Sequence, residues 1–176
     1  MDEQLATKSA VLLVDDEESI LNSLRRLLRG QPYEVVLATS GAQALEIMAT
    51  RPIDLVMSDA RMPGMDGATL LAEVHRLYPA TSRILLTGYA DLTTIIKAIN
   101  DGQIHRYISK PWNDEELQLV LQQTLEHQRL ERLARDQTEQ LKLLNATLEK
   151  RVAARTAELQ QTADMLDLAY DELKRS

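Results

Sequence analysis

Three acidic residues lie at the ends of two apolar runs. Asp15 and Asp16 follow the run 11–14, and Asp59 closes the run 53–58. If these runs are parallel strands of one sheet, their carboxyl ends lie at the edge where α/β proteins bind ligands. Carboxylates brought that close repel one another unless a cation lies between them, and hard divalent ions prefer oxygen ligands. The sequence therefore predicts a Mg²⁺ site formed by these three side chains.

Two further polar residues lie at the ends of later apolar runs. Thr87 ends the run 84–87, and Lys110 follows the run 107–109. A threonine hydroxyl can donate a hydrogen bond, and a lysine ammonium is a frequent partner of phosphate. Together with the acidic residues, they indicate a site for a phosphoryl group beside the metal ion.

The elements that must position these residues alternate between strand-like and helix-like segments. The strand-like runs, rich in Val, Ile and Leu as doubly buried strands are, cover 10–14, 33–38, 53–58, 83–87 and 105–109. Apolar residues between the runs recur at helical spacing. Ser40 with Gln43 and Asn113 with Glu116 have the spacing of helix N-terminal capping boxes. This alternation predicts an α/β fold with a five-stranded, doubly wound parallel sheet.

The chain changes character after Trp112. Residues 113–176 contain no Pro and no Gly and consist mainly of good helix formers. Val152, Leu159, Leu166 and Leu173 recur every seven residues, and the step of four from Leu148 to Val152 is a stutter in this repeat. The pattern favours a long helix paired in a parallel two-stranded coiled coil; the alternative is a solvated, partly frayed helix.

Composition narrows the classes of function. The chain of 176 residues contains no Cys, which suits a reducing compartment and leaves no disulfide or thiolate site. It has no run long enough to cross a membrane and no secretory signal, so we expect a cytoplasmic protein. The parts before and after residue 112 carry net charges of −3 and −4, which argues against a nucleic-acid partner.

Four motifs of the chain resemble the receiver domain of bacterial two-component response regulators. They are VLLVDDEESIL at 11–21, LVMSDARMPGMDG at 55–67, ILLTGYAD at 84–91 and YISKPW at 107–112. The resemblance covers residues 9–128 and leaves 129–176 as a signalling helix. It implies a flavodoxin-like sheet of strand order 2-1-3-4-5, with a cis peptide bond permitted before Pro111.

The resemblance also implies roles for individual residues. The phospho-acceptor is Asp59, and the Mg²⁺ ligands are Asp15, Asp16, Asp59 and the backbone carbonyl of Arg61. The side chains of Thr87 and Lys110 hold the phosphoryl oxygens. The residues that change position on phosphorylation are Thr87 and Tyr107. The donor is a sensor histidine kinase, and the domain catalyses only its own phosphorylation and dephosphorylation. A half-buried structural role is the alternative for Tyr107.

Two bulky residues are individual to this chain. Arg61 lies two residues after Asp59, and Tyr89 lies two residues after Thr87. We expect both side chains to overhang the site and to tune the lifetime of the phosphorylated form by limiting the access of water.

The output of the predicted switch stays open. Receivers that end in SKPW and continue into such a helix resemble the N-terminal part of HD-GYP regulators, which hydrolyse cyclic di-GMP. We therefore expect a homodimer through the C-terminal helix and a linked effector beyond residue 176. Alternatives are a diguanylate cyclase or histidine kinase output, or a stand-alone receiver or dimerisation module.

Two other classes of function fit the residues less well. A Mg²⁺-dependent phosphatase or phosphotransferase needs a general acid soon after the nucleophile, and residues 60–62 contain no carboxylate. A DNA-binding regulator needs a helix-turn-helix segment, and none follows the receiver-like part.

Overall fold

The computed structural model describes residues 8–88, 92–101 and 103–176. Its elements are β1 (Ser9–Val14), α1 (Glu18–Leu27), β2 (Tyr33–Ala38), α2 (Gly41–Thr50), β3 (Leu55–Asp59), α3 (Gly67–Leu77), β4 (Ser82–Thr87), α4 (Leu92–Asn100), β5 (Arg106–Ser109) and α5 (Asp114–Arg175). The five strands are parallel and follow the order β2-β1-β3-β4-β5. The predicted flavodoxin-like sheet is confirmed.

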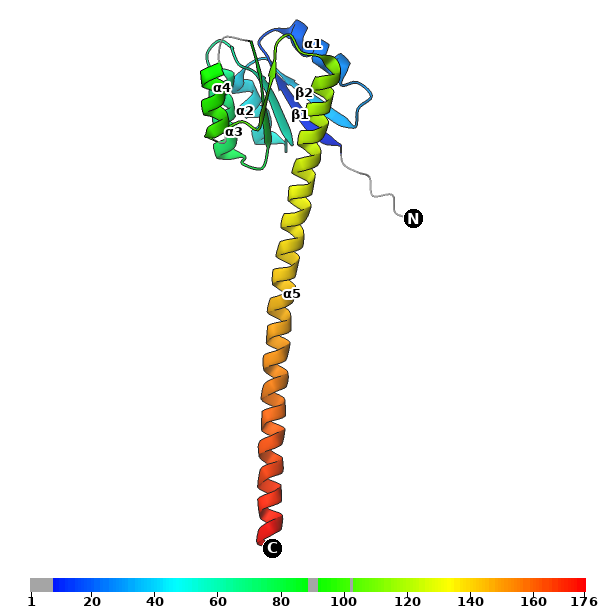
Figure 1. The fold of residues 1–176 in the computed structure, drawn as a ribbon, viewed down its shortest axis with the longest axis vertical. Helices are drawn as coiled ribbons and strands as arrows, with labels where there is room; N and C mark the ends of the chain where they lie inside the picture. Colours follow the sequence, from blue (N-terminus) through cyan, green and yellow to red (C-terminus); the bar gives the residue numbers. More distant parts are fainter. Residues whose placement is uncertain (1–7, 89–91, 102) are drawn as a thin grey trace. The chain divides into compact units, whose positions relative to one another are not determined.

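Helices cover both faces of the sheet, with α1 and the first turns of α5 on one face and α2, α3 and α4 on the other (Figure 1). The side chains of β1 show why its sequence is apolar throughout. Leu12 and Val14 pack in the core under α2, α3 and α4, whereas Val11 and Leu13 pack under α1 and α5. Because both faces are buried, successive residues of a central strand must all be apolar.

The predicted boundaries are wrong by one or two residues for four of the five strands; the first and fourth begin one residue earlier than expected, at Ser9 and Ser82. The third strand was expected at 53–58 but covers Leu55–Asp59, and the fifth was expected at 105–109 but begins at Arg106. Before β3, the Asp54 carboxylate accepts a hydrogen bond from the Ala10 N–H, at 2.8 Å. A side chain thus replaces part of the strand ladder there, which an apolar pattern does not reveal.

The predicted helix caps are present. The Ser40 hydroxyl accepts a hydrogen bond from the Gln43 N–H at 3.1 Å, and the Asn113 side chain accepts from the Glu116 N–H at 3.1 Å. The Gln43 side chain accepts from the N–H of Thr39, one residue before the cap. These bonds satisfy N–H groups that the first turn of a helix leaves without a partner.

At the amino-terminal edge of the sheet, two polar side chains join neighbouring loops. The buried guanidinium of Arg83 donates to the carbonyls of Thr81 and Gln103, each at 2.7 Å, and burial lowers its pKa. The Gln128 amide donates to the carbonyls of Asp54 and Ala80, also at 2.7 Å. These bonds hold the loops that precede β3, β4 and β5, and so help to fix where those strands begin.

Internal contacts divide the chain into two units, residues 1–129 and residues 130–176. The first contains the sheet and its covering helices. The second consists of the later turns of α5, whose residues are exposed from Glu131 to the C-terminus. Among the described residues, no helix is long and apolar enough to span a membrane.

Candidate functional site

The site lies at the carboxyl edge of the sheet. Asp15 follows β1, Asp59 ends β3, Thr87 ends β4, and Lys110 follows β5. The strand register aligns these ends, because Val14 lies beside Ser58 and Thr87 lies beside Ser109. The parallel order of the sheet therefore gathers residues that are far apart in the sequence.

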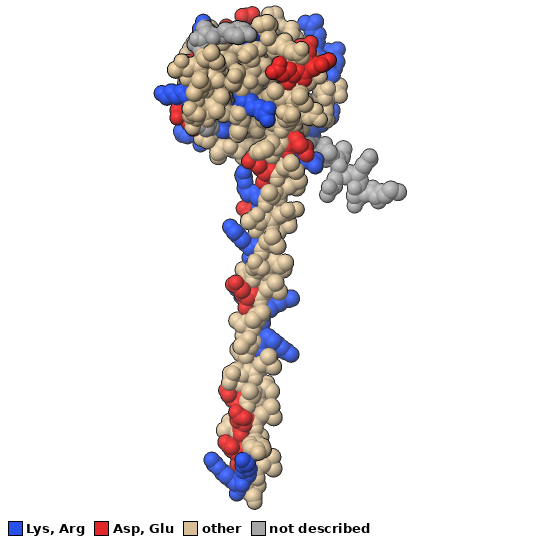
Figure 2. Space-filling model, viewed as in Figure 1, with Lys and Arg blue, Asp and Glu red and all other residues tan. Residues whose placement is uncertain are grey.

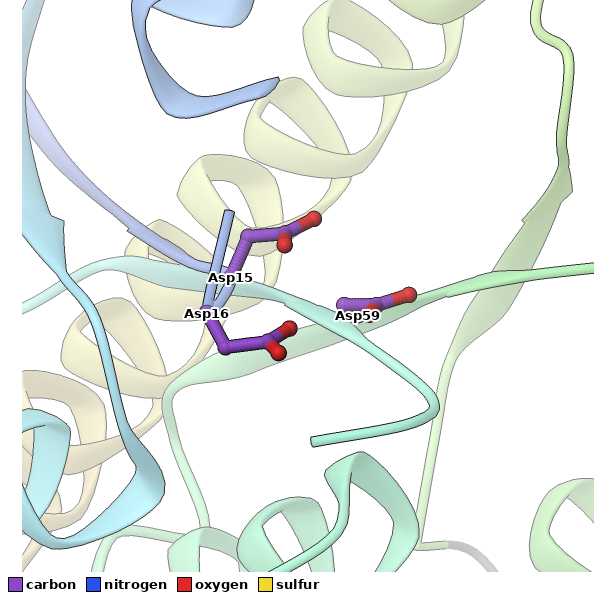
Figure 3. A group of neighbouring side chains, drawn as sticks. All are labelled: Asp15, Asp16 and Asp59. Carbon is purple, nitrogen blue, oxygen red and sulfur yellow. The ribbon is translucent and has the colours of Figure 1, made fainter. Parts of the chain in front are cut away.

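The three predicted carboxylates come together. Asp15, Asp16 and Asp59 each offer an oxygen, and these oxygens lie within 4.8 Å of one another. The side chains of Asp15 and Asp16 extend toward Asp59 (Figure 3). Asp15 and Asp59 are buried, whereas Asp16 is exposed. The cluster thus has two fixed ligands inside the fold and a third on the solvent side.

Lys110 supplies the positive charge of the site. Its Nζ donates to Oδ1 of Asp59 at 2.7 Å and lies 3.5 Å from Oδ2 of Asp15. Burial by itself would lower the pKa of Lys110, but the hydrogen bond that it donates to Asp59 and the charges of both carboxylates outweigh it and raise the pKa. The lysine is therefore charged at neutral pH and offsets part of the repulsion between the two buried acids.

The environment of Asp15 fits a cation ligand. Burial raises the pKa of this carboxyl, and the charge of Asp59 raises it further, against the opposing effects of the Glu17 N–H and Lys110. The Glu17 N–H donates to one oxygen of Asp15 at 2.9 Å and so orients the group. A buried, oriented carboxylate that is costly to ionise favours a divalent cation beside it, and the all-oxygen donor set suits Mg²⁺.

Thr87 lies at the same edge of the sheet as the carboxylate cluster, but its hydroxyl forms its hydrogen bond elsewhere. Its side chain is buried, and its hydroxyl donates to the carbonyl of Gly88 at 3.0 Å. A cavity of about 520 Å³ lies next to it, lined by the β3–α3 loop together with Leu85, Thr87 and Ile95. The hydroxyl therefore has space beside it in which the side chain can change its partner.

The remaining predicted residues are not members of the carboxylate cluster. Arg61 is exposed and lines the same cavity as Thr87. Tyr107 is paired with Leu85 in the sheet and is 43% exposed, so its ring lies outside the core. Tyr89 lies outside the described residues.

Sequence reasoning missed the role of Gly67, although the residue is part of a quoted motif. Gly67 is the first residue of α3, and its N–H donates to the carbonyl of Ala60 at 3.0 Å. A Cβ at this position would overlap the backbone carbonyl oxygen of Asp59 and lie 3.0 Å from Cα of Ala60. The absent side chain lets α3 begin directly against the Asp59 backbone. A glycine just after the helix cap Asp66 was the available signal.

Asp15→Asn is expected to stabilise the fold in the absence of divalent cations, on the order of 1 kcal/mol at neutral pH. The pKa of Asp15 is raised in the fold, so ionisation costs stability as pH rises through that pKa. An amide removes this cost and can still accept from the Glu17 N–H. Thermal unfolding in EDTA measures the effect, which should shrink as the pH falls through the raised pKa.

Asp16→Asn is the matched control, because Asp16 is exposed and its replacement should leave the unfolding temperature nearly unchanged. Added Mg²⁺ should raise the unfolding temperature of the wild type, since a ligand that binds only the folded state stabilises it, and should do so much less for Asp15→Asn. If Asp15→Asn unfolds at a lower temperature than the wild type in EDTA, ionisation of the buried Asp15 carboxyl does not cost stability, and the prediction is wrong.

Comparison with known proteins shows which protein family has a sequence similar to this chain. The profile of the response regulator receiver domain family matches residues 11–122. The chain is 41% identical over 117 residues to the transcriptional regulatory protein ZraR of Escherichia coli O157:H7, which covers 66% of the chain and 26% of ZraR. It is 35% identical over 124 residues to the hydrogenase transcriptional regulatory protein HoxA of Cupriavidus necator, covering 70% of the chain and 26% of HoxA. The chain thus spans about a quarter of the length of these curated relatives.

Solved structures agree with this match. The signal receiver domain of an HD domain-containing protein from Pseudomonas fluorescens Pf-5 is 52% identical, with a TM-score of 0.69, over 74% of this chain and 96% of that one. The CheY-like receiver domain protein of Methanospirillum hungatei JF-1 is 32% identical, with a TM-score of 0.66, over 70% of this chain and 98% of that one.

Proposed function

The chain belongs to the response regulator receiver domain family, and from that premise we propose that Asp59 accepts a phosphoryl group from a sensor histidine kinase. The observation that carries this proposal is the convergence of three carboxylates and Lys110 at one edge of the sheet. Of the three acids, Asp59 is the one that both ends a strand and bonds closely to Lys110.

The transfer follows from the chemistry of the residues. A carboxylate oxygen of Asp59 attacks the phosphorus, a P–O bond forms, and the P–N bond to the donor imidazole breaks with its electron pair leaving on nitrogen. Lys110 is already 2.7 Å from that carboxylate, so its ammonium can hold an oxygen of the incoming group without a large movement. The Thr87 hydroxyl supplies a second donor once it leaves the Gly88 carbonyl.

Asp15, Asp16, Asp59 and the backbone carbonyl of Arg61 would hold Mg²⁺. When bound, the ion neutralises charge on the transferring group. The rest of the reaction depends on the chain itself, which positions Asp59 at a fixed strand end and keeps Lys110 charged. The domain turns over no external metabolite and catalyses only its own modification and its reversal.

The switch follows from the position of Thr87. When its hydroxyl turns toward the phosphoryl group, space opens beside the cavity that Thr87 and Ile95 line. Tyr107, exposed on the neighbouring strand, then moves inward toward Leu85. Phosphorylation thus shifts the population between an outward and an inward state of the face formed by α4, β5 and α5.

The output passes through α5, which continues from the receiver into residues 130–176. This second unit forms a parallel homodimeric coiled coil that connects to a C-terminal effector, and the protein acts in the cytoplasm, where the kinase presents its phosphohistidine. The receiver from an HD domain-containing protein supports a cyclic di-GMP phosphodiesterase of the HD-GYP class as that effector.

Transcriptional regulation is a second candidate output. ZraR and HoxA are transcriptional regulators in which the matched part is about a quarter of the chain. A diguanylate cyclase or a histidine kinase is a further alternative. The acidic balance of both parts of this chain disfavours direct binding of nucleic acid by residues 1–176 themselves.

Acetyl phosphate tests the proposed transfer without the cognate kinase. We expect one phosphoryl group per chain in buffer with Mg²⁺, seen by intact-protein mass spectrometry, and none in EDTA, because the three carboxylates repel the incoming anion when no cation is bound. Calcium in place of magnesium is the matched control for non-specific ionic effects. Equal labelling in EDTA would refute the metal-dependent mechanism.

A further inference from the structure

The second unit contains a hollow on the surface of α5. Its lining consists of Asn145, Leu148, Glu149, Val152 and Ala153. The first four of these are spaced i, i+3, i+4 and i+7, which is the set of four residues that forms the hole in knobs-into-holes packing of paired helices. The hollow therefore has the sequence geometry that receives one side chain from a facing helix.

Large apolar side chains continue from this hollow along the helix. Leu141, Leu144, Leu148 and Val152 are 46–64% exposed, and Leu159, Leu166, Tyr170 and Leu173 are 60–75% exposed. On the face of α5 that Figure 2 shows, long uncharged stretches separate the Lys, Arg, Asp and Glu side chains. At roughly 80 Å² per side chain, these eight residues from each of two copies would bury about 1,300 Å². That area lies within the roughly 1,200–2,000 Å² of stable, specific interfaces.

We propose that a second copy of this chain binds here in a parallel, in-register pair, with Leu148 of each copy inserted into the hollow of the other. The proposal deepens the homodimer of the proposed function and rests on it. The new element is the site that fixes the register of the two helices, and Asn145 is the residue that specifies this register.

The register follows from the lining of the hollow. A core side chain of the d type in a parallel pair fits between partner residues three before it, at its own number, one after it and four after it. For Leu148, these are four of the five residues that line the hollow. Asn145 and Val152 then occupy the preceding and following core positions, so in this register the step from Leu148 to Val152 is a regular heptad step and not the expected stutter. The two Asn145 amides can hydrogen-bond across the interface only when they face each other.

Charge does not oppose this arrangement. In a parallel pair, residues flanking the core contact the residue five positions further along the partner. Arg151 then faces Thr156 of the second copy, and Leu144 faces Glu149. Arg155 is the charged residue on the core line, where Asn145 and Thr162 are polar and uncharged. Its ion pair with Glu158 of the same helix, at 2.8 Å, draws its charge toward the flank.

Cysteine cross-linking in the full chain tests the pairing, because the chain contains no native cysteine. Val152→Cys and Leu166→Cys should each form a disulfide with the same residue of the second copy under mild oxidation. Ala146→Cys and Ala154→Cys lie off the core line and outside the hollow, so they are matched controls and should cross-link at least tenfold more slowly. An antiparallel pair can align at most one position with itself, so failure of either core variant to cross-link overturns the proposal.

Asn145→Leu tests the role of the amide. It should tighten the dimer at least tenfold by sedimentation equilibrium and at the same time produce mixed registers or larger oligomers, because the polar residue limits pairing at a cost in stability. Gln140→Leu adds a similar apolar side chain off the core and should change neither. A chain that stays monomeric yet is labelled by acetyl phosphate would refute this inference and leave the phosphorylation proposal intact. Asn145→Leu dimers with unchanged affinity and register would refute the role of Asn145 and likewise leave the phosphorylation proposal intact.

Discussion

Asp59→Asn is expected to lower Mg²⁺-dependent labelling by acetyl phosphate at least about a hundredfold, because an amide oxygen is a poor nucleophile toward phosphorus. The fold should survive the change. The Asn Oδ1 can still accept from Lys110, which now bonds to Asp59 at 2.7 Å. The loss of that ion pair is partly offset by relief of the repulsion between Asp15 and Asp59. Mass spectrometry of the labelled protein measures the loss, and thermal unfolding checks the fold.

Asp101→Asn is the matched control, since Asp101 is an exposed aspartate of the same unit. It should be labelled at the wild-type rate. Labelling of Asp59→Asn at a comparable rate would move the acceptor to another residue. Peptide mapping of the wild type would then identify that residue directly.

Gly67→Ala is expected to destabilise the protein by about 3 kcal/mol, the upper range for overpacking a tight site. The new Cβ meets the backbone carbonyl of Asp59 and not a flexible side chain, so either α3 or the end of β3 must move. Because Asp59 itself shifts, labelling by acetyl phosphate should fall as well. Urea denaturation measures the stability, and the labelling rate measured well below the unfolding midpoint reports on the site.

Gly88→Ala separates this clash from a general cost of replacing glycine. A Cβ at Gly88 would have no atom within 4 Å, so this variant should change stability by less than about 1 kcal/mol. Equal losses for the two variants would show that crowding against the Asp59 backbone is not the cause.

The alternation of apolar runs with helical patterns was sufficient to predict the fold class, whereas the strand order was predicted from the resemblance to the receiver domain family. A strand buried on both faces must be apolar throughout, as β1 is, and such strands separated by helices form a parallel sheet. The caps at Ser40 and Asn113 were also predictable, because a cap bond joins residues three apart in the sequence.

Boundaries were less predictable where a side chain from elsewhere in the chain intervenes. The start of β3 was placed two residues early because Ile53 is apolar and only one polar residue, Asp54, separates it from Leu55. In the fold, the Asp54 carboxylate binds the Ala10 N–H, 44 residues away. A local pattern contains no information about that contact.

For the site, the sequence by itself determined the residue types and the edge of the sheet at which they lie, because the direction of a parallel strand fixes which end carries its following residue. Only the tertiary structure decided the distances: that Lys110 bonds to Asp59 more closely than to Asp15, that Thr87 is turned to Gly88, and that α3 begins against the Asp59 backbone at Gly67. These distances depend on how segments distant in sequence pack to within a fraction of an ångström, whereas periodicity and strand order constrain only the face and the edge on which a residue lies.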